Sequence, residues 1–193
     1  RHARILAAVP LSEEDALAAG AALLATRTDA SIDKGVLRAT RTRTLGAIPL
    51  SSSPAHALSG EEATALVADH LAARGLGELG WGKEASSLRE RMRALHEALG
   101  APWPDVSDQA LAGSARQWLA PWGRRLASGA PLSTVSMLDA LRSMLPWPAA
   151  ARLDELAPEK LPIPSGGTRA IDWSGPHPVL TLRVQQAFGW TDT

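Results

Sequence analysis

Apolar residues between positions 59 and 157 recur at steps of three and four, which is the spacing of one face of an α-helix. Ser59 and Glu62 precede the first of these stripes with the spacing of a capping box, and Gly75 follows it. A second stripe ends at Gly100. The first stripe contains Ala63, Leu66, Val67 and Leu71, and the second contains Ala85, Leu88, Met92, Leu95 and Leu99. The pattern predicts a helix over each.

Three further helices are predicted before position 158. The first follows a cap at Asp105 or Ser107 and carries Leu111, Ala115, Trp118 and Leu119. The second occupies residues 133–145, and a short third one runs between Pro148 and Pro158. Because short connections join these amphipathic segments, a compact helical bundle is expected.

The N-terminal residues show shorter, strand-like patterns. Residues 1–10 form an apolar run that predicts a short strand, and Ser12 starts an acidic, helix-like segment. The Thr-rich stretch that follows is centred on Asp33-Lys34-Gly35, which predicts a β-hairpin. Pro49, Pro54 and the serines between them predict a loop at the exit of this block.

The segment 163–173 contains a Ser-Gly-Gly sequence that could be a phosphate-binding loop or the turn of a hairpin. A phosphate loop of the Walker type requires GxxxxGK[ST], and that spacing occurs nowhere in the chain. Ile171 and Trp173 alternate with polar or small residues after the glycines, and a second alternating run contains Leu180, Leu182 and Val184. A turn with a C-terminal hairpin is therefore predicted, followed by a helical turn at 184–189.

These patterns divide the chain into a β region at 1–58, a helical region at 59–158, and a β-hairpin with its tail at 159–193. The predicted fold class is α+β, with a central helical bundle and a C-terminal β-hairpin. Two arrangements of the β segments stay open: the two ends of the chain share one sheet, or the C-terminal hairpin is separate.

The composition limits the kinds of partner and site that can be expected for this chain. The formal net charge of the 193 residues is zero, so attraction to nucleic acid must come from a local patch. The absence of Cys excludes disulfides and thiolate metal sites and fits the reducing cytoplasm. No apolar run reaches the roughly 18 residues of a membrane helix. Because the sequence starts with Arg1 and His2 rather than Met, it is expected to be a piece of a longer protein.

The sequence offers no independent active site. Its five His residues are scattered, without the HExxH pair of a metal site, so no metal or other cofactor is expected in this chain. His177 and Asp172 flank one turn, but no GxSxG nucleophile accompanies them. A free-standing enzyme is accordingly the last of three hypotheses, and no residue is predicted to be catalytic.

Basic residues are the remaining candidates for a functional site, as possible contacts to nucleic acid. Arg41 and Arg43 lie on one face of the predicted strand, Arg38 lies on the other face, and Lys34 lies at the adjoining turn. Arg169 and Arg183 belong to the C-terminal hairpin, and Trp173 is a candidate for stacking on a base. The alternative interpretation is that Arg and Thr simply occupy a solvated strand face and pair with nearby acids.

Four stretches occur in the order seen in HrpB-type ATP-dependent helicases, and the chain resembles the C-terminal region of that family. They are "RTRTLGAIPLSSSP", "DVSDQALAGSARQWLAPW", "LDALRSMLPWPAAARLDELAPEKLPIPSGGTRAIDW" and "PVLTLRVQQAFGW". The family forms resemble LxVPSGxxxxIDY and PxLAVRLQExFG. Matching positions are Ile163, Pro164, Ser165, Gly166, Ile171, Asp172, Leu182, Arg183, Gln185, Phe188 and Gly189, whereas Trp173, Val184 and Gln186 are variants.

The resemblance implies a parent of the DEAH/RHA group of superfamily 2, which hydrolyses ATP with Mg²⁺ between two motor lobes. The motor motifs are absent here, and Asp154-Glu155 is followed by Leu-Ala instead of Ala-His, so no catalytic residue carries over. The resemblance also implies an oligonucleotide-binding (OB)-like fold for the N-terminal β region. The first hypothesis is therefore a noncatalytic helicase module that contacts RNA, single-stranded DNA or its own motor lobes. The alternative is a protein-docking module of the same helicase that does not bind nucleic acid.

Overall fold

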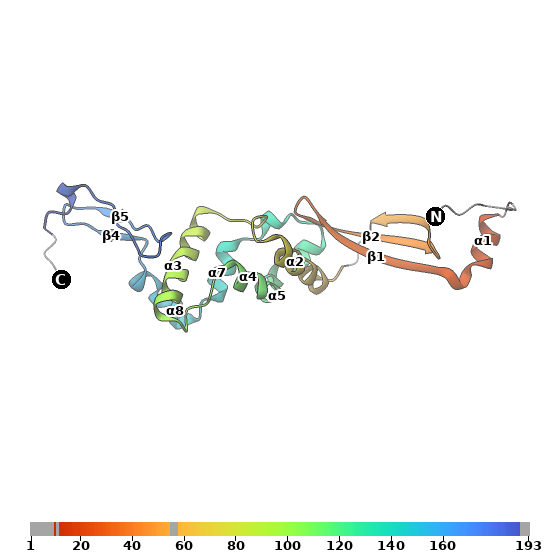
Figure 1. Ribbon diagram of the computed structural model, residues 1–193, viewed down its shortest axis with the longest axis horizontal. Helices are drawn as coiled ribbons and strands as arrows, with labels where there is room; N and C mark the ends of the chain where they lie inside the picture. Colours follow the sequence, from red (N-terminus) through yellow and green to blue (C-terminus); the bar gives the residue numbers. More distant parts are fainter. Residues whose placement is uncertain (1–9, 11, 55–57, 190–193) are drawn as a thin grey trace, which may run out of the picture.

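The computed structural model describes residues 10, 12–54 and 58–189. Its parts follow one another along the long axis of the molecule in chain order (Figure 1). A three-stranded sheet extends from one side of a helical body, and a small two-stranded sheet lies on the opposite side. The predicted strand at 1–10 lies outside the described residues except for Pro10.

The larger sheet is an antiparallel meander in the order β1-β2-β3. Its strands are β1 (Leu24–Asp33), β2 (Val36–Leu45) and β3 (Ile48–Pro54), and it is preceded by the helix α1 (Glu13–Ala19) and the 3-10 turn η1 (Ala21–Leu23). The predicted hairpin is present, but the predicted exit loop is wrong because it is β3. Pro49 and Pro54 are compatible with a strand there because β3 lies at the edge of the sheet.

The turn between β1 and β2 is attached to the helical body. Lys34 and Gly35 form this turn with positive φ angles of 49° and 72°. The Leu132 amide donates a hydrogen bond of 2.7 Å to the Gly35 carbonyl oxygen, and Leu37 is buried. The sheet is therefore fixed at its turn, and the opposite ends of β1 and β2 extend away from the body (Figure 1).

The helical body begins with the two helices predicted most directly. Ser59 and Glu62 cap α2 as a complete capping box, with bonds of 2.8 and 3.1 Å, and α3 ends at Gly100 as expected. The predicted third helix is instead divided at Ser114, whose hydroxyl donates to the Ala110 carbonyl. The helices are α2 (Gly60–Arg74), α3 (Lys83–Leu99), α4 (Asp108–Gly113), α5 (Ala115–Trp118), α6 (Gly123–Ala127), α7 (Met137–Met144) and α8 (Trp147–Leu156).

Short 3-10 turns complete this part of the chain: η2 (Ala120–Trp122) and η3 (Leu132–Thr134). No pattern in the sequence predicts α6, a helix of five residues. Its first residue, Gly123, lies against the first turn of α2, where an added Cβ would be 2.4 Å from the Gly60 carbonyl oxygen. This close approach brings α2 and α6 together around a buried core. The core includes Leu71, Met92, Leu111, Leu119, Leu126, Met137 and Leu141.

The C-terminal β segments form a sheet of their own. The strands β4 (Lys160–Pro162) and β5 (Thr168–Ala170) pair across the Ser-Gly-Gly segment, where Gly166 and Gly167 have φ angles of 91° and 84°. The prediction of a turn is thus confirmed. The predicted second run is wrong as a strand, because within the described residues it pairs only at Val179 with Asp172 and then enters η4 (Val184–Gln186).

The arrangement of strands settles the alternative left open by the sequence. β4 and β5 pair with each other and not with β1, β2 or β3, so the C-terminal hairpin is separate. The α+β class is confirmed in its broad form. Over residues 24–54 the sheet is an open meander of three strands, and the OB-like form of the N-terminal region stays a prediction.

Candidate nucleic-acid interface

The candidate site is one face of the three-stranded sheet and is centred on Arg41 and Arg43 of β2. Only Thr42 lies between these arginines along the strand, so both project from the same face, with their Cα atoms about 6.6 Å apart. Both side chains are exposed. Arg38 lies on the other face, as the alternation predicts.

Hydroxyl groups surround the two arginines. Thr28 of β1 and Ser53 of β3 are opposite Arg41, whereas Thr26 and Ser51 are opposite Arg43. These four residues were missed by the sequence analysis. The two-residue turn after Asp33 would have identified the β1 neighbours, because such a turn fixes the register of a hairpin. We call Arg41, Arg43, Thr26, Thr28, Ser51 and Ser53 the hydroxyl-arginine face.

The guanidinium groups of this face are not neutralised by acids. Within the described residues, no carboxylate lies within 4.0 Å of Arg41 or Arg43, and Asp29, the nearest acidic residue of β1, belongs to the opposite face. Residues 24–54 contain five Arg or Lys and two Asp, a net charge of +3 in a chain whose total is zero. The sheet is therefore a local basic patch.

The other sheet residues predicted for the site lie close to the helical body. Lys34 is at the attached turn, and Arg38 lines a groove of about 550 Å³ between the sheet and the end of α6. Ser52, Ser53 and Ser128 contribute hydroxyl groups to the same groove. Because Ser53 belongs to both surfaces, the groove is continuous with the hydroxyl-arginine face.

The structure does not bring the remaining predicted residues to this face. Arg169 lies on β5, and Arg183 immediately precedes η4, on the opposite side of the helical body (Figure 1). Trp173 is only 8% exposed, and its Nε1 donates a hydrogen bond of 3.0 Å to the Pro158 carbonyl oxygen. In this conformation the Trp173 ring packs against the core, so it is not available for stacking on a base.

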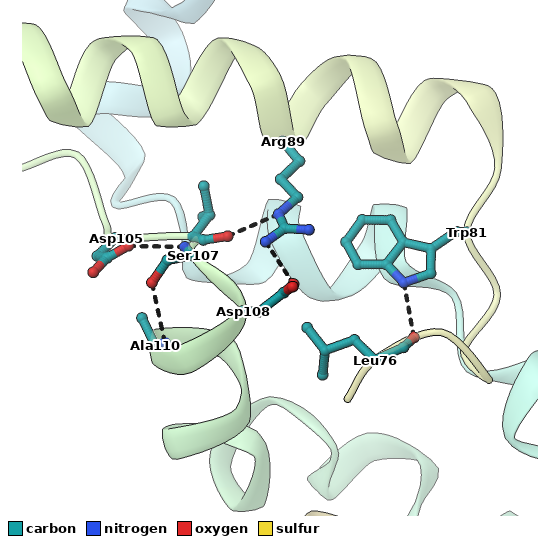
Figure 2. Close-up of polar contacts among 8 residues, drawn as sticks. Leu76, Trp81, Arg89, Asp105, Ser107, Asp108 and Ala110 are labelled. Atoms are coloured by element: carbon teal, nitrogen blue, oxygen red, sulfur yellow. Dashed lines mark hydrogen bonds and ion pairs between the residues drawn. The ribbon is translucent and has the colours of Figure 1, made fainter. Parts of the chain in front are cut away.

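Arginines of α3 differ from those of β2 because each has a partner in the structure. Arg89 donates through Nε to the Val106 carbonyl and through Nη2 to Asp108, both at 2.8 Å (Figure 2). Its guanidinium carbon also lies 5.2 Å from the centre of the Trp81 ring, a cation–π contact. Arg89 therefore connects α3 to the segment that starts α4.

The groove beside Arg89 has a volume of about 590 Å³ and is already crossed by internal bonds. Trp81 donates to the Leu76 carbonyl at 2.9 Å, and Asp105 accepts the Ser107 amide at 2.8 Å (Figure 2). The hydrogen bond from the Ser107 backbone amide, and then that from the Ser107 side chain, lower the pKa of Asp105 below its ordinary value. The polar groups of this groove serve as caps and connections between helices.

Arg91 and Arg93 connect α3 to the C-terminal part of the chain. Arg91 is 3% exposed, and it donates to the Ala157 carbonyl at 2.5 Å, to Glu159 at 3.1 Å and to Asp154. Arg93 donates to Glu97 and to carbonyl oxygens of the segment 173–175. Arg91 and Arg93 are therefore structural residues that hold the C-terminal part of the chain on α3.

Two histidines on the helices also have structural partners. His70 lies 3.3 Å from a Glu78 oxygen, and His96 Nδ1 lies 2.8 Å from the Trp103 carbonyl, to which it donates. Within residues 12–54 and 58–189, no three His, Asp or Glu residues converge in a way that could hold a metal ion. Among the described helices, none is long and apolar enough to cross a membrane.

The chemistry of the hydroxyl-arginine face suits phosphate groups. Guanidinium groups donate bidentate, charge-assisted hydrogen bonds to phosphate oxygens, and hydroxyls add neutral ones. The face contains no aromatic residue. Its composition therefore favours contacts with a nucleic-acid backbone over stacking on bases.

Comparison with known proteins relates the chain to a class of helicases. Residues 118–193 match the family model described as "ATP-dependent helicase C-terminal". One relative is the ATP-dependent RNA helicase HrpB of Escherichia coli, to which the chain is 31% identical over 160 residues. That alignment covers 81% of this chain and 20% of the relative.

Solved structures agree with the sequence comparison. The crystal structure of Escherichia coli DEAH/RHA helicase HrpB matches 86% of this chain with 27% identity and a TM-score of 0.62, and a crystal structure of E. coli DExH-box NTPase HrpB matches 94% with 26% identity and the same TM-score. The chain spans 22% and 23% of those structures, about a fifth of their length. The resemblance to the C-terminal region of HrpB-type helicases is thereby confirmed.

Proposed function

We propose that this chain is a noncatalytic accessory module of an ATP-dependent helicase and that it contacts the backbone of single-stranded RNA or DNA through the hydroxyl-arginine face. One observation carries the proposal: Arg41 and Arg43 lie side by side on an exposed strand face whose cross-strand neighbours are hydroxyl residues and not acids. ATP hydrolysis with Mg²⁺ is assigned to motor lobes outside these 193 residues, and the module is proposed to act with them in the cytoplasm.

The test is binding of a fluorescent single-stranded oligonucleotide, followed by anisotropy at several salt concentrations. Arg41→Glu with Arg43→Glu should weaken binding more than tenfold and make the slope of log affinity against log salt shallower. Each lost phosphate contact should change that slope by about 0.7. Arg41→Lys with Arg43→Lys should retain the slope, because the two charges remain.

A matched control separates a local site from overall charge. Arg169→Glu with Arg183→Glu changes the net charge by the same amount in the C-terminal part of the chain, which lies across the helical body from the three-stranded sheet. The proposal expects this variant to bind like the wild type. Equal losses in both double variants would contradict a site on β2.

Docking on the motor lobes is the second candidate function, and it also has a specific observation. Large apolar side chains are exposed at the extended end of the sheet: Leu23 at 62%, Ile48 at 62% and Leu50 at 38%. Oligonucleotide binding that is undetectable, or that is unchanged by the Arg41 and Arg43 substitutions, would favour docking. The direct measurement is titration of the separately produced motor lobes with this chain, in which Ile48→Ser should weaken association.

A further inference from the structure

The outer edge of β1 differs from the other edge of the same sheet. β3 is short, contains Pro49 and Pro54, and faces a register shift at Arg43, all of which discourage the addition of another strand. β1 has ten residues without Pro, and residues 24–29 are all exposed. Among the described residues, β2 is the only strand that pairs with it. Ala30 and Ile32 pack against the core, so residues 24–29 are the open part of this edge, and an open edge is a template for another strand.

The sequence of this edge is complementary to itself in one antiparallel register. With Thr28 opposite Thr28 of a second copy, Arg27 is opposite Asp29 and Leu24 is opposite Ile32. Within one copy, Arg27 and Asp29 already form an exposed ion pair at 2.5 Å on a single face. Pairing would therefore bring two positive and two negative charges together in alternation, which is favourable across strands.

Neighbouring registers are unfavourable. Sliding the second copy by two residues in one direction places Arg27 opposite Arg27 of that copy. Sliding it by two residues in the other direction places Asp29 opposite Asp29. Like charges directly opposite each other destabilise a sheet. A shift by a single residue would place Arg27 opposite Ala30. Side chains that belong to opposite faces of the sheet would then be paired with each other. The charge pattern thus selects the arrangement centred on Thr28.

We propose that β1 is a self-association edge through which two copies of this chain form a symmetric dimer with one continuous six-stranded sheet. The pairing is antiparallel, so the two helical bodies lie at opposite ends of that sheet. The two-fold axis at Thr28 is perpendicular to the sheet, and the hydroxyl-arginine faces of both copies lie on the same side. The dimer does not depend on nucleic-acid binding, and either proposal can fail without the other.

Cysteine cross-linking tests this geometry directly, because the chain contains no Cys of its own. In the dimer, Thr28→Cys places two sulfur-bearing residues opposite each other with Cα atoms about 4.5–5.5 Å apart, a distance that a disulfide spans. Thr26→Cys is the matched control on the same face, since its two copies are four residues out of register, about 13 Å apart. In a glutathione redox buffer, Thr28→Cys should cross-link at least tenfold faster than Thr26→Cys.

A charge exchange gives a second, independent readout by sedimentation equilibrium. Arg27→Asp alone and Asp29→Arg alone each place like charges opposite each other, and each should raise the dimer dissociation constant about 5- to 30-fold. The double variant restores opposite charges and should return the constant to within about twofold of the wild-type value. Circular dichroism spectra should be the same for all variants.

Two results would overturn the dimer. One is a wild-type chain that sediments as a monomer at every concentration that stays soluble. The other is equal cross-linking rates for Thr28→Cys and Thr26→Cys, which would indicate random collision or a different register.

Discussion

Arg93 on α3 donates a hydrogen bond of 2.9 Å from Nη2 to the carbonyl oxygen of Trp173, which is 80 residues later in the chain. The same Nη2 atom lies 2.7 Å from the Gly175 carbonyl oxygen. A single guanidinium therefore holds the backbone of the segment that follows β5 against the helical body. The buried ring of Trp173 also attaches this segment, because its Nε1 donates a hydrogen bond to the Pro158 carbonyl oxygen.

Arg93→Met should release the segment 173–175 while keeping the aliphatic packing of the side chain. We expect faster amide hydrogen exchange at Asp172 and Val179, which donate to each other's carbonyls at 2.8 Å. Stability should fall by about 1–2 kcal/mol, because charge-assisted bonds to carbonyls are lost from a side chain that is one-third exposed. Arg152→Met is the control, since Arg152 makes only an exposed contact at 3.5 Å with Glu155. Unchanged exchange in Arg93→Met would refute the attachment.

Arg91→Met should lower the free energy of unfolding by about 1–3 kcal/mol, measured by urea denaturation. The reason is the Ala157 carbonyl, which is in a fully buried residue and loses its donor. Asp154→Asn should cost less than about 1 kcal/mol, since Asp154 is exposed and Glu159 remains beside Arg91. A larger loss from Asp154→Asn than from Arg91→Met would show that the exposed pair, and not the buried carbonyl, dominates.

Gly123→Ala should destabilise the helical body by about 1–3 kcal/mol. The added Cβ would lie 2.4 Å from the Gly60 carbonyl oxygen and 2.6 Å from the Thr64 hydroxyl, so α2 and α6 must separate. Gly113→Ala is the matched control in another short helix, where nothing lies within 4 Å of the new Cβ. That variant should be neutral or slightly stabilising, and thermal melts of the two proteins should therefore differ in midpoint. Equal midpoints would contradict the close approach of the two helices.

Glu62 connects stability to pH. Its hydrogen bond from the Ser59 amide, followed by that from the Ser59 side chain, lowers the pKa of Glu62 below its ordinary value of 4.5. A lowered pKa in the folded state means that the contribution is fully present above pH 4.5 and is lost as the pH falls through the folded-state pKa. Glu62→Gln should therefore flatten the fall in stability on acidification, measured by urea denaturation at a series of pH values. Ser59→Ala should flatten this fall only in part, because the backbone amide of residue 59 still donates to Glu62, whereas a Glu61→Gln variant should keep the wild-type slope.

The features predicted correctly from the sequence are those with local causes. The cap of α2 depends on Ser59 and Glu62, three residues apart, and the turn between β1 and β2 depends on Lys34 and Gly35. β3 was missed because its prolines argue against a central strand, and only the sheet order shows that it is an edge. The separation of the two sheets was equally hidden, because it depends on which strands meet.

The candidate site was predicted in part. Alternation alone places Arg41 and Arg43 on one face, but the absence of acids opposite them depends on the register of three strands. The burial of Trp173 depends on Pro158 and Arg93, which are distant from it in sequence. Long-range partners of this kind have no signature in a single sequence, so the structural contacts of Arg89, Arg91 and Arg93 could not be predicted.

The attachment of the β1–β2 turn gives the sheet the mechanics of a cantilever. It is clamped where Gly35 meets Leu132 and where Leu37 enters the core, and its far end carries no such clamp among the described residues. A force applied at Arg41 or Arg43 would therefore act several residues away from the point of attachment. It would be transmitted through the Gly35–Leu132 contact to the segment 131–135, which is hydrogen-bonded to Gly80 ahead of α3.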